Sequence, residues 1–282
     1  MILPSVRDYR ILWTLLLAVG CGCSRFDQAP LHERQKTVTV AHVAGAPLRV
    51  EAGTGSITVA KSDRADVQIV GDLRAISEER LEAAEIIASR GDDETLFVRV
   101  EWPDGRPLNR EGCSFEILIQ EAVGVILTSA NGELHASDLA GAADLRTVNG
   151  SIHVERHAGP IEAHSVNGAV NVSGAAGAVK ATTTNGTLGI ALAPESIGPV
   201  DAHALNGAID LMVGPSFAGK LSLETTNGMV IADESVAAHV VHSDRHHALL
   251  AFGTGEQQSS AATVNGLVRV SALGDKSDGE QL

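Results

Sequence analysis

The sequence repeats an Asn-Gly pair at a nearly constant spacing between residues 124 and 232. The repeated asparagines are separated by 18, 18, 18, 21 and 21 residues, and they are Asn131, Asn149, Asn167, Asn185, Asn206 and Asn227. A second glycine recurs on the same step, at Gly141, Gly159, Gly177, Gly198 and Gly219. A fixed period of this length is typical of repeat architectures, in which each unit is a small element that stacks on its neighbours.

Apolar and polar residues alternate on both sides of each Asn-Gly pair. In the second unit, Ala143, Leu145 and Thr147 occupy alternate positions before the pair, and Ile152 and Val154 do so after it. Alternation over runs this short predicts β-strands with one buried face. The other units carry the same pattern, so the sequence predicts two strands in every unit and an all-β fold.

Two architectures satisfy this pattern. Asn-Gly between alternating strands is a strong hairpin signal, which would give a long antiparallel meander. Alternatively, each unit is one coil of a β-solenoid with single-stranded, β-helix-like coils of 18–21 residues, and Asn-Gly forms a corner. Equivalent positions keep their residue type from unit to unit, as expected when they stack about 4.8 Å apart. Only 3% of the residues are aromatic, which suits a thin core. We therefore favour the solenoid.

The repeat also resembles a family of bacterial domains of unknown function that are described as putative adhesins. The units of that family read G-x-V-x-A-x-T-x-N-G-x-I-x-V, and residues 159–172 and 177–190 are similar to this pattern. Residues 51–59 (EAGTGSITV), the charged segment near 78–89 and residues 98–104 (VRVEWPD) resemble the N-terminal half of the family. The resemblance implies a β-solenoid, and it implies adhesion through the family's name alone.

The first twenty residues have the features of a bacterial lipoprotein signal. Arg7 and Arg10 precede a short apolar run, and small residues then lead to Cys21. Such a run is long enough for a signal peptide and too short to span a bilayer. We predict that residues 1–20 are removed and that Cys21 carries the lipid; an ordinary secretory signal is the alternative. Resemblance to bacterial lipoproteins implies a diacylglyceryl thioether and an N-acyl chain (such as palmitate), which together hold a protein stably on a membrane.

The segments between this signal and the repeats are less regular. Residues 21–36 are predicted to be a tether, and residues 37–121 an irregular β region with its first strand at 37–43. One short helix is expected near 78–89, because Ser77 is a good N-cap and Leu81, Ala84 and Ile87 would share one face. If Cys21 is acylated, Cys23 and Cys113 remain, and a disulfide between them is permitted outside the cytoplasm.

The repeat region is predicted to cover residues 122–275. After residue 232 the period lapses, and strands are expected at 239–252 and 263–271. Asn265-Gly266 would be the last corner, 38 residues after Asn227, which corresponds to nearly two coils. The charged residues 276–282 are predicted to be disordered.

The Asn-Gly asparagines themselves are the first candidate site. Asparagine tolerates a left-handed backbone, and stacked asparagine side chains hydrogen-bond to one another. We therefore interpret the column as a structural ladder rather than a ligand site.

The histidines are candidate metal ligands or pH sensors. His135 and His153 occupy equivalent positions on consecutive units, where two imidazoles could bind a transition metal. Their column continues with Asn171, Gly189 and Asp210, so no third ligand follows. A looser cluster near Asp244 contains His239, His242, His246 and His247. We interpret both groups as solvated surface and predict no metal and no cofactor.

The remaining chemistry is sparse. Asp144 and Glu162 stack on adjacent units, and paired carboxylates are used for glycoside cleavage. However, Lys180 interrupts their column, and no nucleophile or phosphate-binding motif is present. The net charge of −14 argues against nucleic-acid binding, which would require a basic surface.

We predict a non-enzymatic, lipid-anchored protein of the cell envelope, on the outer membrane or the cell surface. Its repeat surface would be presented for adhesion or for interaction with a protein or polysaccharide. Self-assembly through the ends of the stack is an alternative, because open ends expose strand edges. A carbohydrate-active enzyme that uses Asp144 and Glu162 is a further alternative.

Overall fold

The structure is a computed structural model that describes residues 30–274, and over this range the chain is all-β with one short α-helix. The predicted signal peptide, the lipid site at Cys21, Cys23 and the tail 276–282 lie outside the described residues. None of the helices within residues 30–274 is long or apolar enough to cross a bilayer.

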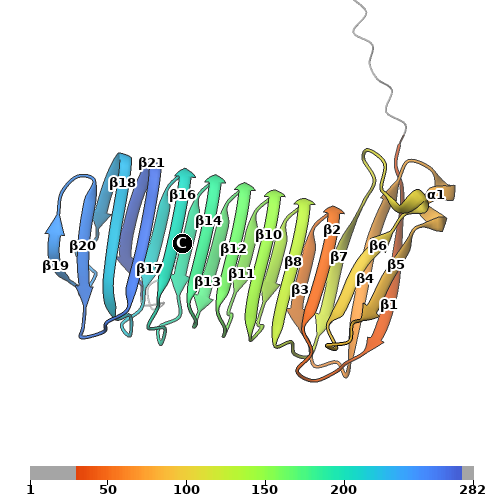
Figure 1. Ribbon diagram of the computed structural model, residues 1–282, viewed down its shortest axis with the longest axis horizontal. Coiled ribbons are helices and arrows are strands. Elements are labelled where there is room, and N and C mark those ends of the chain that lie inside the picture. Colours follow the sequence, from red (N-terminus) through yellow and green to blue (C-terminus); the bar gives the residue numbers. More distant parts are fainter. Residues whose placement is uncertain (1–29, 275–282) are drawn as a thin grey trace, which may run out of the picture. The chain divides into compact units, whose positions relative to one another are not determined.

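The repeat units occupy the middle of the described chain (Figure 1). Their first strands are β8 (Gly124–Asn131), β10 (Ala142–Asn149), β12 (Ile161–Asn167), β14 (Val179–Asn185) and β16 (Val200–Asn206). Their second strands are β9 (Leu134–Ser137), β11 (Ile152–Glu155), β13 (Val170–Ala175), β15 (Leu188–Leu192) and β17 (Ile209–Val213). We call the first set ladder A and the second set ladder B.

Within each ladder, every strand pairs in parallel with the corresponding strand of the next unit. Leu145 of β10, for example, lies opposite Leu127 of β8 and Ala163 of β12. In ladder B, Val154 of β11 lies opposite Ala136 and Val172. The Asn-Gly pairs therefore do not close antiparallel hairpins in residues 124–213, and this pairing excludes the meander for the region.

The inward side chains of both ladders form one continuous hydrophobic core. Leu145, Ile152 and Val154 are fully buried, as the alternation predicted, and their counterparts in the other units are buried too. The third inward position of ladder A carries a hydroxyl in every strand except β16, where Ala204 stands. These hydroxyl-bearing residues are buried, as are two at the corresponding position of later strands, and together they are Ser129, Thr147, Ser165, Thr183, Thr225 and Thr263.

The C-terminal strands are not stacked in sequence order. They are β18 (Gly219–Ala232), β19 (His239–Ser243), β20 (His247–Phe252) and β21 (Gln258–Ala272). β21 pairs in parallel with β16 and β17 on one side and with β18 on the other. Asn265 therefore lies between Asn206 and Asn227, and the expectation that Asn265-Gly266 is the last corner is wrong. The 21-residue step from Asn206 to Asn227 gave no sign of an inserted strand.

The N-terminal strands show the same kind of insertion. The elements are β1 (His32–Ala41), β2 (Leu48–Thr54), β3 (Ile57–Lys61), β4 (Asp66–Ala75), α1 (Glu78–Ala83), β5 (Glu85–Arg90), β6 (Leu96–Glu101), the 3-10 turn η1 (Pro103–Gly105) and β7 (Gly112–Ile119). β2 lies between β6 and β8, and β3 lies between β7 and β9, all in parallel. Antiparallel strands complete both ends of the stack: β5 on β6, β4 on β7, β1 on β4, β20 on β18 and β19 on β20.

Two N-terminal boundaries differ from the prediction. β1 begins at His32, inside the predicted tether, because it pairs with β4 along ten residues. α1 starts as expected, with the Ser77 hydroxyl accepting a hydrogen bond from the Arg80 N–H. It ends at Ala83 rather than near residue 89, and Ile87 belongs to β5. The adjacent isoleucines at 86 and 87 favour a strand, and antiparallel pairing with β6 satisfies their backbone.

Candidate functional site

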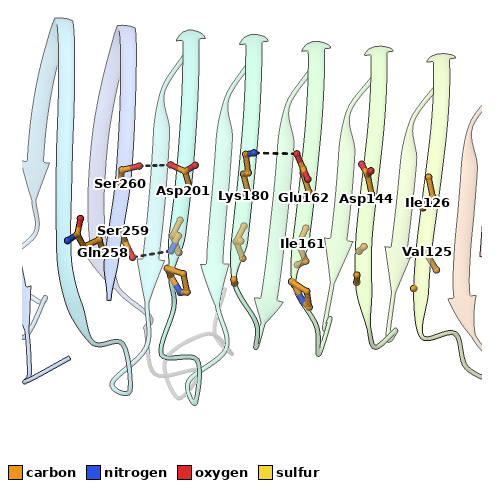
Figure 2. Close-up of a pocket in the computed structure, with 18 of the residues that line it drawn as sticks. Val125, Ile126, Asp144, Ile161, Glu162, Lys180, Asp201, Gln258, Ser259 and Ser260 are labelled. Atoms are coloured by element: carbon orange, nitrogen blue, oxygen red, sulfur yellow. Dashed lines mark hydrogen bonds and ion pairs between the residues drawn. The ribbon is translucent and has the colours of Figure 1, made fainter. Parts of the chain in front are cut away.

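A groove crosses ladder A near the start of its strands (Figure 2). Its cavity volume is about 900 Å³. One lining position recurs in each unit, and it is occupied by the compact residues Gly124, Ala142, Pro160, Ala178 and Pro199. Because the lining comes from successive units, the groove runs along the direction in which the units stack.

A row of outward side chains follows the groove. Its members lie directly opposite one another on adjacent parallel strands. They are, in order, Ile126, Asp144, Glu162, Lys180, Asp201 and Ser260. Neighbouring strands in a sheet lie about 4.8 Å apart. From Asp144 to Ser260 the row therefore places one polar group on each strand, beside a mostly apolar lining.

The two carboxylates considered for glycoside cleavage are adjacent in this row, but both face cations. The Arg146 guanidinium lies 2.7 Å from the Asp144 carboxylate and 3.9 Å from that of Glu162. Lys180 Nζ lies 3.5 Å from Glu162 Oε1 on the other side. Both carboxylates are therefore engaged in ion pairs with cationic side chains of the same surface.

Asp201 is the best-supported carboxylate of the row. The Ser260 hydroxyl donates a hydrogen bond of 2.5 Å to Asp201 Oδ1, and His203 Nε2 lies 2.8 Å from the same oxygen. Burial opposes ionisation, but these two partners outweigh it, so the pKa of Asp201 lies below its usual value. Sequence reasoning did not single out Asp201 or Ser260, because strand insertion brings Ser260 beside Asp201.

The corner asparagines lie one above another and are joined through their side chains. From Asn149 onward, each side-chain NH2 group donates to the side-chain carbonyl of the preceding member over 2.8–2.9 Å, in the order Asn131, Asn149, Asn167, Asn185, Asn206, Asn265, Asn227. These side chains are exposed. Every asparagine of the row is thus bonded to at least one other member, which supports the structural interpretation.

A second, buried row of hydrogen bonds accompanies the asparagines. The Thr183 hydroxyl donates to the carbonyl oxygen of Gly168 over 2.9 Å, and Ser165 donates in the same way to Gly150. The row is broken at Ala204, which has no hydroxyl. The sequence pattern places these residues on the buried face, together with the apolar ones. Their recurrence as Ser or Thr in successive units is the sequence feature that indicates a row of hydroxyl hydrogen bonds.

Among the histidines considered as metal ligands, two pairs have neighbouring rings within residues 30–274. His135 and His153 have ring centroids 6.3 Å apart, and His153 Nε2 pairs with Glu133 over 2.8 Å. His242 and His247 have ring centroids 5.4 Å apart. Among residues 30–274, no group of three or more His, Cys, Asp or Glu side chains is placed to hold a metal ion.

Asp244 organises the second histidine group instead. The backbone N–H of His246, the side chain of His242 and the N–H of His247 contact its carboxylate and lower the pKa of Asp244 to about 2. His239 lies on the neighbouring strand β19, outside these contacts. The Asp244 carboxylate therefore stabilises the turn that carries these histidines.

Cys113, on β7, is a buried thiol that forms no disulfide within residues 30–274. Burial, together with the nearby charge of Asp72, raises the pKa of the Cys113 thiol to about 12. A thiol of this kind is unreactive at neutral pH, because the thiolate is the nucleophile. The disulfide with Cys23 involves a residue outside the described range.

No protein-family model matches the chain, and no curated protein matches it. Several solved structures are similar to it at low identity, among them the following three. A putative cell adhesion protein from Clostridium sporogenes is 14% identical, with a TM-score of 0.37, and the match covers 86% of this chain and 100% of the other. A putative adhesin from Bacteroides fragilis is 14% identical over 86% and 97%, with a TM-score of 0.43. A putative adhesin from Parabacteroides distasonis is 10% identical over 85% and 97%, with a TM-score of 0.40.

Proposed function

We propose that this chain is a non-enzymatic β-solenoid, held in the cell envelope by a lipid on Cys21, that binds an extended protein or polysaccharide. The observation that carries the binding proposal is the groove across ladder A, whose lining is drawn from successive units. A linear ligand lying along the stacking direction would meet the same kind of surface at every strand. The parallel pairing of successive units supports the solenoid.

The charges along the groove favour binding over catalysis. Asp144, Glu162 and Lys180 are engaged with neighbouring side chains, so none is left as an isolated acid or base. The groove combines apolar lining with fixed polar groups, which is the usual composition of a ligand site.

The binding proposal is tested by filling the groove. The full chain, carried on lipid vesicles, is passed over surfaces coated with peptidoglycan, a capsular polysaccharide or collagen. We expect retention on at least one surface, and a loss of about tenfold in affinity with Ala142→Trp, equivalent to about 1.4 kcal/mol. Asn171→Trp, at an exposed position of ladder B, is the matched control and should bind as the unchanged chain does. Equal binding by the unchanged chain, Ala142→Trp and Asn171→Trp would refute the groove as the binding surface.

A separate measurement tests the absence of catalysis. The same polysaccharides are incubated with the full chain and assayed for new reducing ends. We expect none. Turnover that disappears in the double variant Asp144→Ala, Glu162→Ala would favour the carbohydrate-active alternative.

A further inference from the structure

β19 is the outermost strand beyond the repeats at the end that also holds β18 and β20 (Figure 1). It comprises His239–Ser243 and pairs with β20 along one edge through four of these five residues, Val241 lying in a bulge. All five are exposed, and the side chains of Val240 and Val241 are 52% and 53% exposed. A strand paired on one side presents its other N–H and C=O groups to any further strand.

The hydrophobic core reaches this edge without being closed. Leu221 of β18 lies opposite Leu250 of β20, and Leu250 lies opposite Val240. Leu221 and Leu250 are buried, whereas Val240 is half exposed. One more strand beyond β19 would continue the inward row and cover Val240.

β19 also lacks the features that natural edge strands use to prevent pairing. Charged residues and prolines are the common protection, and the residues 239–243, HVVHS, include neither. At the N-terminal end, by contrast, β1 carries Glu33, Arg34 and Lys36, and β5 carries Glu85 and Arg90. The open, uncharged edge therefore occurs at one end of the stack.

We propose that the free edge of β19 pairs in antiparallel fashion with β19 of a second copy. The result is a closed, two-fold dimer in which the two stacks meet at their β19 strands. A two-fold interface must be self-complementary. His-Val-Val-His reads the same in both directions, so antiparallel self-pairing places valines in the centre and imidazoles beside them. The bulge between Val240 and His242 adds local twist to the strand, and a second copy has the same twist. This inference is independent of the ligand of the groove.

The test is the mass of the full chain in detergent solution, measured by light scattering over a hundredfold range of concentration. We expect a concentration-dependent mass that stops at two copies. The double variant Val240→Lys, Val241→Lys places like charges opposite each other and should raise the dissociation constant at least about tenfold. Monomers at every concentration, or unchanged dimers in this variant, would overturn the proposal.

Two further comparisons make the result specific. The matched control is Val123→Lys, Val148→Lys, which adds the same charge at equally exposed valines away from β19 (53% and 46% exposed); it should leave the dimer intact. Thermal unfolding followed by circular dichroism checks that both double variants fold. Growth beyond two copies would contradict the closed dimer and indicate that both ends associate.

Discussion

The repeated middle of the chain and its N-terminal end are stabilised in different ways. In residues 124–213, the same few contacts recur in unit after unit: an asparagine ladder, a buried hydroxyl row and an aliphatic core. At the N-terminal end, α1, β1 and β5 are held by contacts that occur once. Lys36 donates to the carbonyl of Glu82, and Arg90 donates to that of Ala41 over 2.7 Å.

A buried ion pair is the centre of these single contacts. Arg80 of α1 makes a two-pronged contact with the Glu111 carboxylate, at 2.8 and 2.9 Å, and the Leu108 N–H donates to the same group. Burial alone would raise the pKa of Glu111, but these donors outweigh it and lower that pKa below its usual value. The comparison indicates that the middle depends on repeated backbone geometry, whereas the end depends on a few specific side chains.

The largest predicted effect is at the N-terminal end. Glu111→Gln leaves Arg80 beside a neutral partner, and breaking a buried ion pair costs about 4 kcal/mol of unfolding free energy. The measurement is chemical denaturation at pH 7. Asp104→Asn, which removes an exposed partner of the same guanidinium, should cost less than about 1 kcal/mol. Similar losses in both variants would show that the buried carboxylate has no special role.

The lowered pKa of Glu111 also predicts how the stability lost in Glu111→Gln depends on pH. A carboxylate with a lowered pKa stabilises the fold above its unfolded value of about 4.3, and this stabilisation is lost as the pH falls through the folded value. The difference in unfolding free energy between the original chain and Glu111→Gln should therefore become smaller below about pH 4.3.

In the middle, the most sensitive positions are the glycines that follow the asparagines. A Cβ added at Gly168 would lie 2.0 Å from the Gly150 carbonyl oxygen of the preceding unit. Because both atoms belong to the backbone, Gly168→Ala must push two units apart, and we expect a loss of about 3 kcal/mol in denaturant unfolding. Gly53→Ala, whose Cβ would meet nothing within 4 Å, should be nearly neutral. A harmless Gly168→Ala would contradict the close stacking of the units.

A single buried histidine adds acid sensitivity to the middle. His157 Nε2 donates to the Gly141 carbonyl, and Nδ1 has no partner among the described residues. Burial lowers the pKa of His157, which this hydrogen bond only partly opposes. The unfolded chain therefore binds a proton first as the pH falls below about 6.5, and stability decreases by at most about 1.4 kcal/mol per pH unit.

Replacing that histidine should remove the effect. Leu139 occupies the equivalent position of the preceding unit and is buried. His157→Leu should therefore fold at pH 8 and lose less stability between pH 7.5 and 5.5 than the original chain. His246→Leu, at an exposed histidine, should keep the original pH dependence. An unchanged profile in His157→Leu would assign the acid sensitivity to other groups.

The smallest predicted effect is a gain in stability. Ala204 interrupts the buried hydroxyl row, whereas Thr183 and Thr263 on the flanking strands donate to Gly168 and Gly207. Ala204→Thr should supply the missing donor to Gly186 and stabilise the fold by about 0.5 kcal/mol. Ala204→Val adds similar bulk without a donor. A gain that is equal for both would attribute the effect to packing.

The same comparison explains which parts of the structure could be predicted from the sequence. The buried faces in residues 124–213 followed from alternation, because the period of a strand assigns each side chain to a face. The N-cap of α1 followed from Ser77, yet the helix ended at Ala83 because pairing with β6 extends the chain from Glu85. The groove was not predicted, since its lining depends on which small residues become neighbours across units.

The sequence by itself determined the repeat: its step, its two strands per unit and its asparagine column, since each of these depends on residues close in the chain. Only the tertiary structure decided the order of units at the two ends, where β2 lies between β6 and β8 and β21 lies between β16 and β18. Strands that share one residue pattern can pair with any similar strand. Their order is therefore set by packing across the whole stack. It cannot be predicted from the spacing of the repeated residues along the chain.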